Sequence, residues 1–552
     1  GCGLDKATAD IRRPQVSWDG KKIAFGARAS ASEPLAVYEM NADGTGCAKN
    51  ADIAAGPANA NGLLVHNFDP AYSPPGPDGR SRIVFASTRG FGSSSPSDYS
   101  GPQRTPADPQ KPNANLHVLE PDPGAPGKNR VRQITFQLNM ERQPSFMNDG
   151  RVIMTAEKRA QSFYQLALRR INLDGGDYHP LYAQRATIGY LQASGVVELA
   201  DKNFVTVFND PGAAHGGGAI GVFNRSIGID FTSKNPNDYV IDPSVIDPAS
   251  PSSPVPGFFL RSLHFPDPTA SGHPREPTTG AYYAPSALPD GRMLVSWGAA
   301  TDIAGFGGDY DVYVMDPVRG AKVKLLGEAG SAEVEAVAIY GRAPRSIYAS
   351  SLDEPNGHTV VYPNKSEAEI TVLNVPVFAS LLFQNTPTGR VVEKIDSVEI
   401  WEELPPPLDH ASNDNGSPNV ATDAYGKVFV KRRMLGRAPL ANDGSVKVRI
   451  PGGIPILLKV PESDVSRQKN LPRFQRETIQ FAPGEYAHQS FKPVFFDGMC
   501  AACHNSISGR PMDAVLKPDL LTQASKVQAK DGEPIDANVP PAQRGPVVGP
   551  TP

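Results

Sequence analysis

The chain of 552 residues contains only four cysteines, two near each end. Four are too few for a disulfide scaffold of this length, so each cysteine needs its own explanation. Lysine and arginine number 54 against 58 aspartates and glutamates, without a long basic run, which argues against a nucleic-acid-binding surface. The longest apolar stretch, Thr371–Phe383, contains Asn374 and Pro376 and is too short for a transmembrane helix. Nucleophile-elbow, P-loop and dinucleotide-binding fingerprints are also missing.

Proline and glycine are abundant, with 55 and 52 residues, and this suits many short strands joined by turns. One pattern recurs, in which a proline precedes Asp-Gly, a basic residue and an alternating apolar run. Asp-Gly supplies the positive-φ turn of a hairpin, and the alternation is typical of strands. Strong copies begin at Pro14, Pro77, Pro144 and Pro285, and weak copies at Leu199 and Ala338.

These copies predict six four-stranded units over residues 10–362. The fold class that we expect is mainly β, with a six-bladed β-propeller in which radial repetition protects the strand edges. The strong copies resemble the PD40 repeats of TolB-like propellers. An irregular array of β-sandwiches is the alternative.

The sequence pattern changes after residue 364. Residues 365–465 contain short strands without the Asp-Gly-basic signature and predict a β-sandwich-like domain. Residues 466–526 are more polar and predict a small helical module. Residues 527–552 form a proline-rich tail, and residues 1–9 are an N-terminal anchor segment.

The strongest chemical signal is Cys500-Ala501-Ala502-Cys503-His504. Cys-x-x-Cys-His is the attachment sequence of c-type haem, because two thiols reach the two vinyl groups while the histidine meets the iron. Half of a zinc site and a thioredoxin-like redox pair are the alternatives. The first lacks a second cysteine pair and the second lacks a βαβ setting. We therefore predict one covalent haem c held by Cys500, Cys503 and His504.

The sixth ligand of the iron is left open by the sequence. His488 lies before the motif and Met512 after it, where Gly509 and Pro511 permit the chain to turn back. Another residue or an open position are the remaining alternatives. Two strong axial ligands favour electron transfer, whereas an open position would bind small ligands.

The order of propeller, β-domain and haem motif, with Phe481–Glu485 leading into Phe495–His504, resembles the hydrazine synthase alpha-subunit family. The resemblance covers most of the chain, and it implies a periplasmic multidomain protein with a C-terminal c-type haem. The synthase carries a further haem in an N-terminal domain, whereas Cys500–His504 is the only such motif here.

Covalent haem attachment takes place outside the bacterial cytoplasm, so we expect the periplasm or the outer cell surface. Gly1-Cys2-Gly3 is typical of a lipoprotein cleavage point, and a lipid anchor on Cys2 is one reading of it. A disulfide between Cys2 and Cys47, which an oxidising compartment permits, is another, and free thiols are the third.

The function that we expect is an exported monohaem c-type cytochrome acting in electron transfer. Its propeller would dock redox partners or a larger membrane-associated complex. The alternatives are a haem enzyme like the hydrazine synthase alpha subunit and a propeller that serves as a binding or structural subunit. Weaker candidates are calcium at Asp177–His179 or Asp309–Asp311, and a metal at His264, His273 and Glu276.

Overall fold

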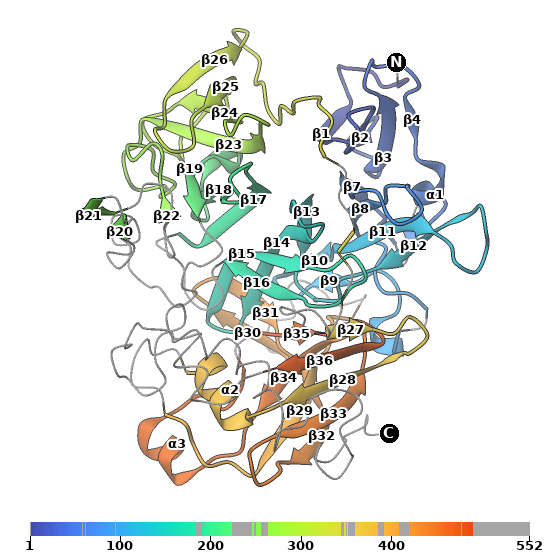
Figure 1. Ribbon diagram of the computed structural model, residues 1–552, viewed down its shortest axis with the longest axis vertical. Coiled ribbons are helices and arrows are strands. Elements are labelled where there is room, and N and C mark those ends of the chain that lie inside the picture. Colours follow the sequence, from blue (N-terminus) through green and yellow to red (C-terminus); the bar gives the residue numbers. More distant parts are fainter. Residues whose placement is uncertain are drawn as a thin grey trace.

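The computed structural model describes residues 2–57, 59–60, 62–93, 95–182, 190–223, 246–247, 250–254, 263–343, 347–348, 350, 359–384, 391–407, 419–475 and 477–489. These residues form a mainly β protein with few helices and several antiparallel sheets, none of which is closed (Figure 1). The first part of the chain builds four-stranded units, and the second part builds two packed sheets.

The first part contains five units, each an antiparallel meander of four strands. The third and fourth units are joined by a short parallel pairing of Leu166 with Gln192. The strands are β1 (Asp10–Val16), β2 (Lys22–Arg28), β3 (Ala36–Asn41) and β4 (Ala48–Lys49); β7 (Asn67–Tyr72), β8 (Ile83–Ser87), β11 (Asn115–Pro121) and β12 (Asn129–Gln133); β13 (Glu141–Phe146), β14 (Val152–Ala160), β15 (Phe163–Ile171) and β16 (His179–Tyr182); β17 (Gln192–Glu198), β18 (Phe204–Asn209), β19 (Ala219–Phe223) and β22 (Leu263–His264); and β23 (Gly280–Ala287), β24 (Met293–Ala299), β25 (Asp311–Met315) and β26 (Lys322–Leu326).

Shorter elements decorate these units. They are α1 (Ala51–Ala54), β5 (Asn59–Ala60), β6 (Leu63–Leu64), β9 (Arg104–Thr105), β10 (Asp108–Pro112), β20 (Ile246–Asp247), β21 (Ser250–Pro254) and two 3-10 turns, Ser97–Tyr99 and Ala214–Gly216.

The Asp-Gly turns join the first two strands of four units, as the sequence predicts. Each turn glycine has a φ between 72° and 91°, and each turn aspartate accepts a hydrogen bond from the backbone N–H two residues later. In the fourth unit the same turn is made by Asp201 and Lys202, with a φ of 70° at the lysine. The residues concerned are Asp19–Gly20, Asp78–Gly79, Asp149–Gly150 and Asp290–Gly291.

The first strands of the units lie next to one another in chain order: β1 contacts β7, β7 contacts β13, β13 contacts β17 and β17 contacts β23. Apolar side chains fill the space between successive units. Val84, Phe85 and Leu116 are fully buried among the first three units, and Tyr282 and Met293 are buried between the last two. Packing of this kind stabilises the array through burial of apolar area.

The sixth unit of the predicted propeller does not form within the described residues, because 327–343, 347–348 and 350 contain no strand. Residues 331–343 instead run in extended form between the fifth and first units (Figure 1). The Arg342 N–H donates to the Trp18 carbonyl at 2.7 Å, and Val337 packs on the first unit. Gly341-Arg342 lacks the turn aspartate of the strong copies, and Pro344 follows without an N–H for a ladder.

The second part is a β-sandwich. One sheet has the order β27 (Thr359–Val361), β36 (Glu485–Gln489), β28 (Glu367–Val372), β33 (Val446–Pro451), and the other β32 (Arg432–Pro439), β29 (Ser397–Glu403), β34 (Pro455–Lys459), β35 (Ile479–Gln480). Buried Ile370 and Val448 of one sheet meet Ile400 and Leu458 of the other. The remaining elements are α2 (Val375–Leu382), β30 (Val420–Asp423), β31 (Gly426–Phe429) and α3 (Asp464–Lys469).

The sandwich extends beyond the boundary at residue 465 that the sequence indicates. β35 and β36 belong to its two sheets, and β36 runs parallel to β28 in the middle of one of them. Of the helical module expected over 466–526, the described residues contain only the end of α3. The residues from 490 onwards, which include the proline-rich tail, lie outside the described part.

The two parts share a continuous interior. Phe91, Tyr99 and Phe136 of the second unit and its connection belong to the apolar cluster of the sandwich. The Tyr99 hydroxyl donates to a Glu402 carboxylate oxygen at 2.9 Å. Among the described residues, no helix is long and apolar enough to cross a bilayer.

Candidate functional site

Of the residues predicted to bind haem, the structure describes only His488. Cys500, Cys503, His504 and Met512 lie outside the described residues. His488 lies in β36, half-buried, in register with Thr371 of the parallel strand β28. Because Ala487 packs into the sandwich core, His488 is on the opposite face of the sheet. Within the described ranges, no group of three His, Cys, Asp or Glu side chains could hold a metal ion.

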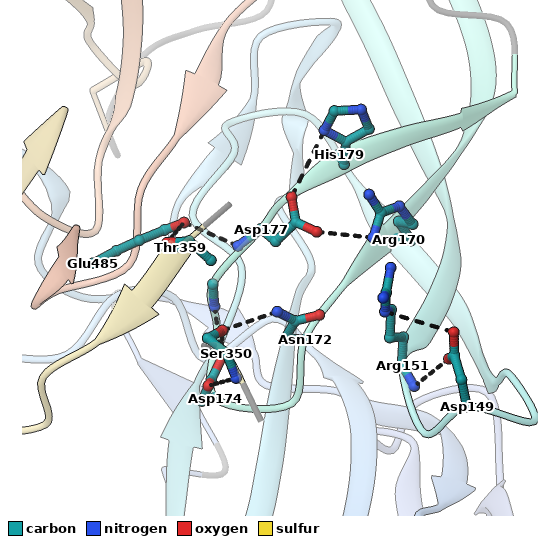
Figure 2. A network of polar contacts seen from close by, with 11 residues as sticks. Asp149, Arg151, Arg170, Asn172, Asp174, Asp177, His179, Ser350, Thr359 and Glu485 are labelled. Carbon is teal, nitrogen blue, oxygen red and sulfur yellow. Dashed lines mark hydrogen bonds and ion pairs between the residues drawn. The ribbon is translucent and has the colours of Figure 1, made fainter. Parts of the chain in front are cut away.

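β36, which precedes the predicted haem motif in the sequence, is fixed at its first residue. Glu485 is only 2% exposed, and its carboxylate binds both parts of the molecule (Figure 2). Oε1 accepts hydrogen bonds from the Asp177 N–H and the Thr359 hydroxyl, both at 2.9 Å. Oε2 accepts from the Ala482 N–H at 2.8 Å. Burial outweighs these three hydrogen bonds and raises the pKa of Glu485 to about 8.

The partner of Glu485 is the turn between β15 and β16 of the third unit. The Asp177 carboxylate pairs with Arg170 at 2.8 Å and lies 3.7 Å from His179 Nδ1 (Figure 2). The Asp174 carboxylate accepts from both the N–H and the hydroxyl of Ser350, each at 2.8 Å. This turn is therefore held by polar contacts on both sides. Asp177 and His179, considered above as calcium ligands, take part in this network.

A second polar constellation lies where the first strands of the five units meet. Each strand has a bulge, and one residue in each bulge takes a left-handed φ between 46° and 69°. A proline follows in four of the five. Glu335, in the extended segment, has the same conformation with a φ of 59°. The bulge residues are Arg13, Asp69, Gln143, Gly195 and Ala284.

Side chains of these bulges hold neighbouring units together. The Asp69 carboxylate accepts from the Gln143 N–H at 3.0 Å, and the Gln143 amide oxygen accepts from the Gly195 N–H at 3.0 Å. The Glu335 carboxylate accepts from the Arg13 N–H at 2.6 Å and from the Tyr283 hydroxyl at 3.2 Å. Glu335 thus occupies a sixth place beside the five units. Burial raises the pKa of Asp69.

A pocket of about 290 Å³ lies beside this set of bulges, lined by four of the first strands and by residues 335–343. Arg13, Glu198, Glu335 and Arg342 give it charges of both signs. The Arg342 guanidinium lies over the Trp18 ring, 5.1 Å from its centre. The volume of the pocket is close to the lower end of the range that small-molecule sites occupy. Sequence reasoning missed it, although an X-Pro pair before the hairpin turn marks four of the five bulges.

The remaining sequence candidates take part in other contacts. His273 Nδ1 lies 2.6 Å from an Asp210 carboxylate oxygen, and its ring stacks on Tyr190 at 4.1 Å. Glu276 accepts from the Ser271 hydroxyl at 3.1 Å. His264 pairs in register with Val222. At the second calcium candidate, Asp311 pairs with Lys324 at 2.8 Å.

The N-terminal cysteines are joined. Cys2 and Cys47 form a disulfide with a Cα–Cα distance of 4.9 Å, which is one of the alternatives that the sequence leaves open. Cys2 and Leu4 pack against the apolar cluster of the first unit. The bridge fastens the N-terminal segment to the strand region that follows β3.

No protein-family model matches the chain, and no curated protein matches it. Among solved structures, hydrazine synthase of Kuenenia stuttgartiensis is similar over 93% of this chain and 65% of that one, at 16% identity and a TM-score of 0.58. The chain thus spans slightly less than two thirds of that protein. The Hadza microbial sialidase Hz136 matches 58% of this chain and 59% of its own, at 14% identity and a TM-score of 0.34. The first likeness indicates a related fold.

Proposed function

We propose that the protein is an exported c-type cytochrome that transfers electrons through one covalent haem. The observation that carries this proposal is Cys500-Ala501-Ala502-Cys503-His504. Two thiols that bond to the vinyl groups and an imidazole that binds the iron, at this spacing, are the groups that hold haem c, whose iron supplies reversible one-electron chemistry. Cys500 and Cys503 would bind the haem covalently and His504 would bind the iron.

The second axial ligand of the iron would be His488, Met512 or another residue, or this position would be open. His488 belongs to a strand that buried contacts of Glu485 fix against the third unit. A ligand on such a strand would tie the haem segment to the sandwich, whereas Met512 would not. Absorption and magnetic circular dichroism spectra of His488→Ala and Met512→Ala separate the possibilities, because only the true ligand's loss changes the low-spin signature.

The units of the first part would serve as a docking platform for a redox partner or a larger complex, and β26 supports this. It is the outer strand of the fifth unit, and among the described residues no strand pairs with its free side. Val323, Leu325 and Leu326 are 72%, 64% and 53% exposed. An edge strand with exposed apolar side chains is a template for a further strand, and in β26 these side chains alternate with Lys322 and Lys324. Residues 327–343 form no strand that could pair with this edge of β26. We therefore propose that an extended segment of the partner protein pairs with it.

Substitution tests this docking surface. Leu325→Lys should weaken binding of the partner protein at least tenfold, because it places a charge in an apolar contact. Val465→Lys, at a 38% exposed position on α3 of the sandwich, is the matched control and should leave binding unchanged. Equal effects of the two changes would refute the assignment to β26.

An oxidising compartment is supported by the disulfide between Cys2 and Cys47. A sulfur in a disulfide does not carry a lipid thioether, so we favour the periplasm or outer surface without an anchor at Cys2. Non-reducing mass spectrometry of the exported protein decides between the two modifications.

A haem enzyme related to hydrazine synthase is the second candidate, and the likeness to the Kuenenia stuttgartiensis structure is the observation that favours it. Carbon monoxide separates the candidates. A shift of the reduced Soret band would indicate an open position suited to catalysis, whereas an unchanged band favours electron transfer. For the haem itself, peroxidase staining after denaturing electrophoresis should be positive for the native chain and strongly weakened in Cys503→Ala.

A further inference from the structure

A small cavity of about 30 Å³ lies between the third unit and the sandwich. Its wall carries Lys158, Arg159 and Arg169 from β14 and β15, and Glu477 from the sandwich. The side chains of the three cations are 8%, 1% and 5% exposed, so water screens them little. The volume exceeds what one water molecule needs and has room for a small ion.

Two of the cations of this cavity share one carboxylate oxygen. Arg159 has its own partner, Asp423, at 2.8 Å, whereas Lys158 and Arg169 both bind the same oxygen of Glu477. One carboxylate thus serves two buried cations. Two further carboxylates, those of Glu157 and Glu403, lie in the wall. Glu403 has Arg432 at 3.5 Å, and burial raises the pKa of Glu157. Burial likewise raises the pKa of nearby Glu141 to about 7.

Among the buried hydrogen-bonding groups of the wall, donors without a partner outnumber acceptors without a partner. Arg169 Nε and Nη1, Arg159 Nε and Gln137 Nε2 are buried donors without a hydrogen-bond partner. Only one wall acceptor, Asn139 Oδ1, is in the same condition. A small anion accepts from several donors and brings no proton.

We propose that this cavity binds one small inorganic anion of halide size, with chloride as the physiological ligand, between the third unit and the sandwich. The anion would pair with Arg169, whose guanidinium lacks partners on two nitrogens, and would complete the bonding of Arg159 and Gln137. It would thereby join the two parts of the molecule at a buried position.

The direct test uses bromide, which scatters anomalously. Crystals of the full chain grown at pH 6 and soaked in sodium bromide should show an anomalous peak in this cavity, within hydrogen-bond distance of Arg169. Ordered water without anomalous signal, or bromide only at the molecular surface, would overturn the proposal.

A solution experiment follows the same site without crystals. At constant ionic strength, replacing gluconate by chloride should raise the unfolding temperature of the native protein by roughly 1–3 °C per tenfold chloride, because the ligand binds only the folded state. Arg169→Lys removes the Nε donor and should abolish this increment. Arg130→Lys, at an exposed arginine that pairs with Glu120, is the control and should keep it. A chloride-independent native protein would contradict the proposal even if Arg169→Lys does not fold.

Discussion

Replacing Glu485 by glutamine should make the protein less sensitive to alkaline pH. Glu485 is buried where β36 meets the third unit, and its pKa is raised from 4.5 to about 8. A group whose pKa is higher in the folded state binds its proton more tightly there. Its contribution to stability is complete below the unfolded pKa and is lost as pH rises through the folded pKa. Glutamine mimics the protonated acid and does not titrate.

The size of the effect follows from the two pKa values. Between pH 6 and pH 9 the folded protein releases the Glu485 proton, while the unfolded chain has already lost it. One pKa unit corresponds to about 1.4 kcal/mol, so the native protein should lose roughly 3 kcal/mol relative to Glu485→Gln over this range. Most of the loss falls between pH 6 and pH 8.

Urea unfolding at pH 6, 7, 8 and 9 measures this difference. Subtracting the two proteins at each pH removes the titration of all other groups. Glu462→Gln, at an exposed glutamate of the sandwich, is the control and should leave the pH dependence unchanged. A native-minus-variant difference that stays constant, or that changes in favour of the native protein as pH rises, would refute the reasoning.

Three further changes test other contacts. Gly20→Ala should lower the free energy of unfolding by about 1–2 kcal/mol more than Gly79→Ala does, as measured by urea unfolding. Both glycines have nearly the same φ, but only a Cβ at residue 20 would meet the Tyr340 backbone, at 2.9 Å. Equal losses would contradict the docking of residues 331–343. Asp423→Asn should destabilise the protein by about 2 kcal/mol, since it leaves the buried Arg159 charge without its partner, and a change below about 0.5 kcal/mol in the same assay would be inconsistent with that pair. Removing the Cys2–Cys47 bridge, which spans a sequence separation of 45, should lower the free energy of unfolding by up to about 4 kcal/mol. Calorimetry of Cys2→Ser/Cys47→Ser measures this change, and an unchanged transition would show that the bridge constrains the chain little.

Local signals in the sequence predicted the local structure well. The Asp-Gly pairs at Asp19, Asp78, Asp149 and Asp290 all became turns between first and second strands, because the turn aspartate and the left-handed glycine act within a few residues. The repeats therefore indicated the units correctly, with the exception of the sixth. Around Gly341 the same apolar alternation occurs without the aspartate, and the chain remains extended without a ladder.

Contacts between residues that are far apart in the chain could not be predicted from the sequence. β36 pairs in parallel with β28 although more than a hundred residues separate them, so the end of the sandwich could not be read from composition. The pairing of Arg159 with Asp423 and the contact of Glu485 with Asp177 likewise depend on how the two parts pack. The predicted haem attachment is the opposite case, since the prediction rests on five consecutive residues, Cys500–His504.

The central claim, a single covalent haem at Cys500 and Cys503, is tested most directly by the haem content of the denatured protein. The chain should be exported from a host with a c-type maturation pathway, denatured, extracted with acidified acetone and assayed as the pyridine haemochrome. We expect one haem per chain to stay with the protein after extraction and to disappear in Cys500→Ala/Cys503→Ala. A native chain that retains no haem under these conditions would contradict the proposed function.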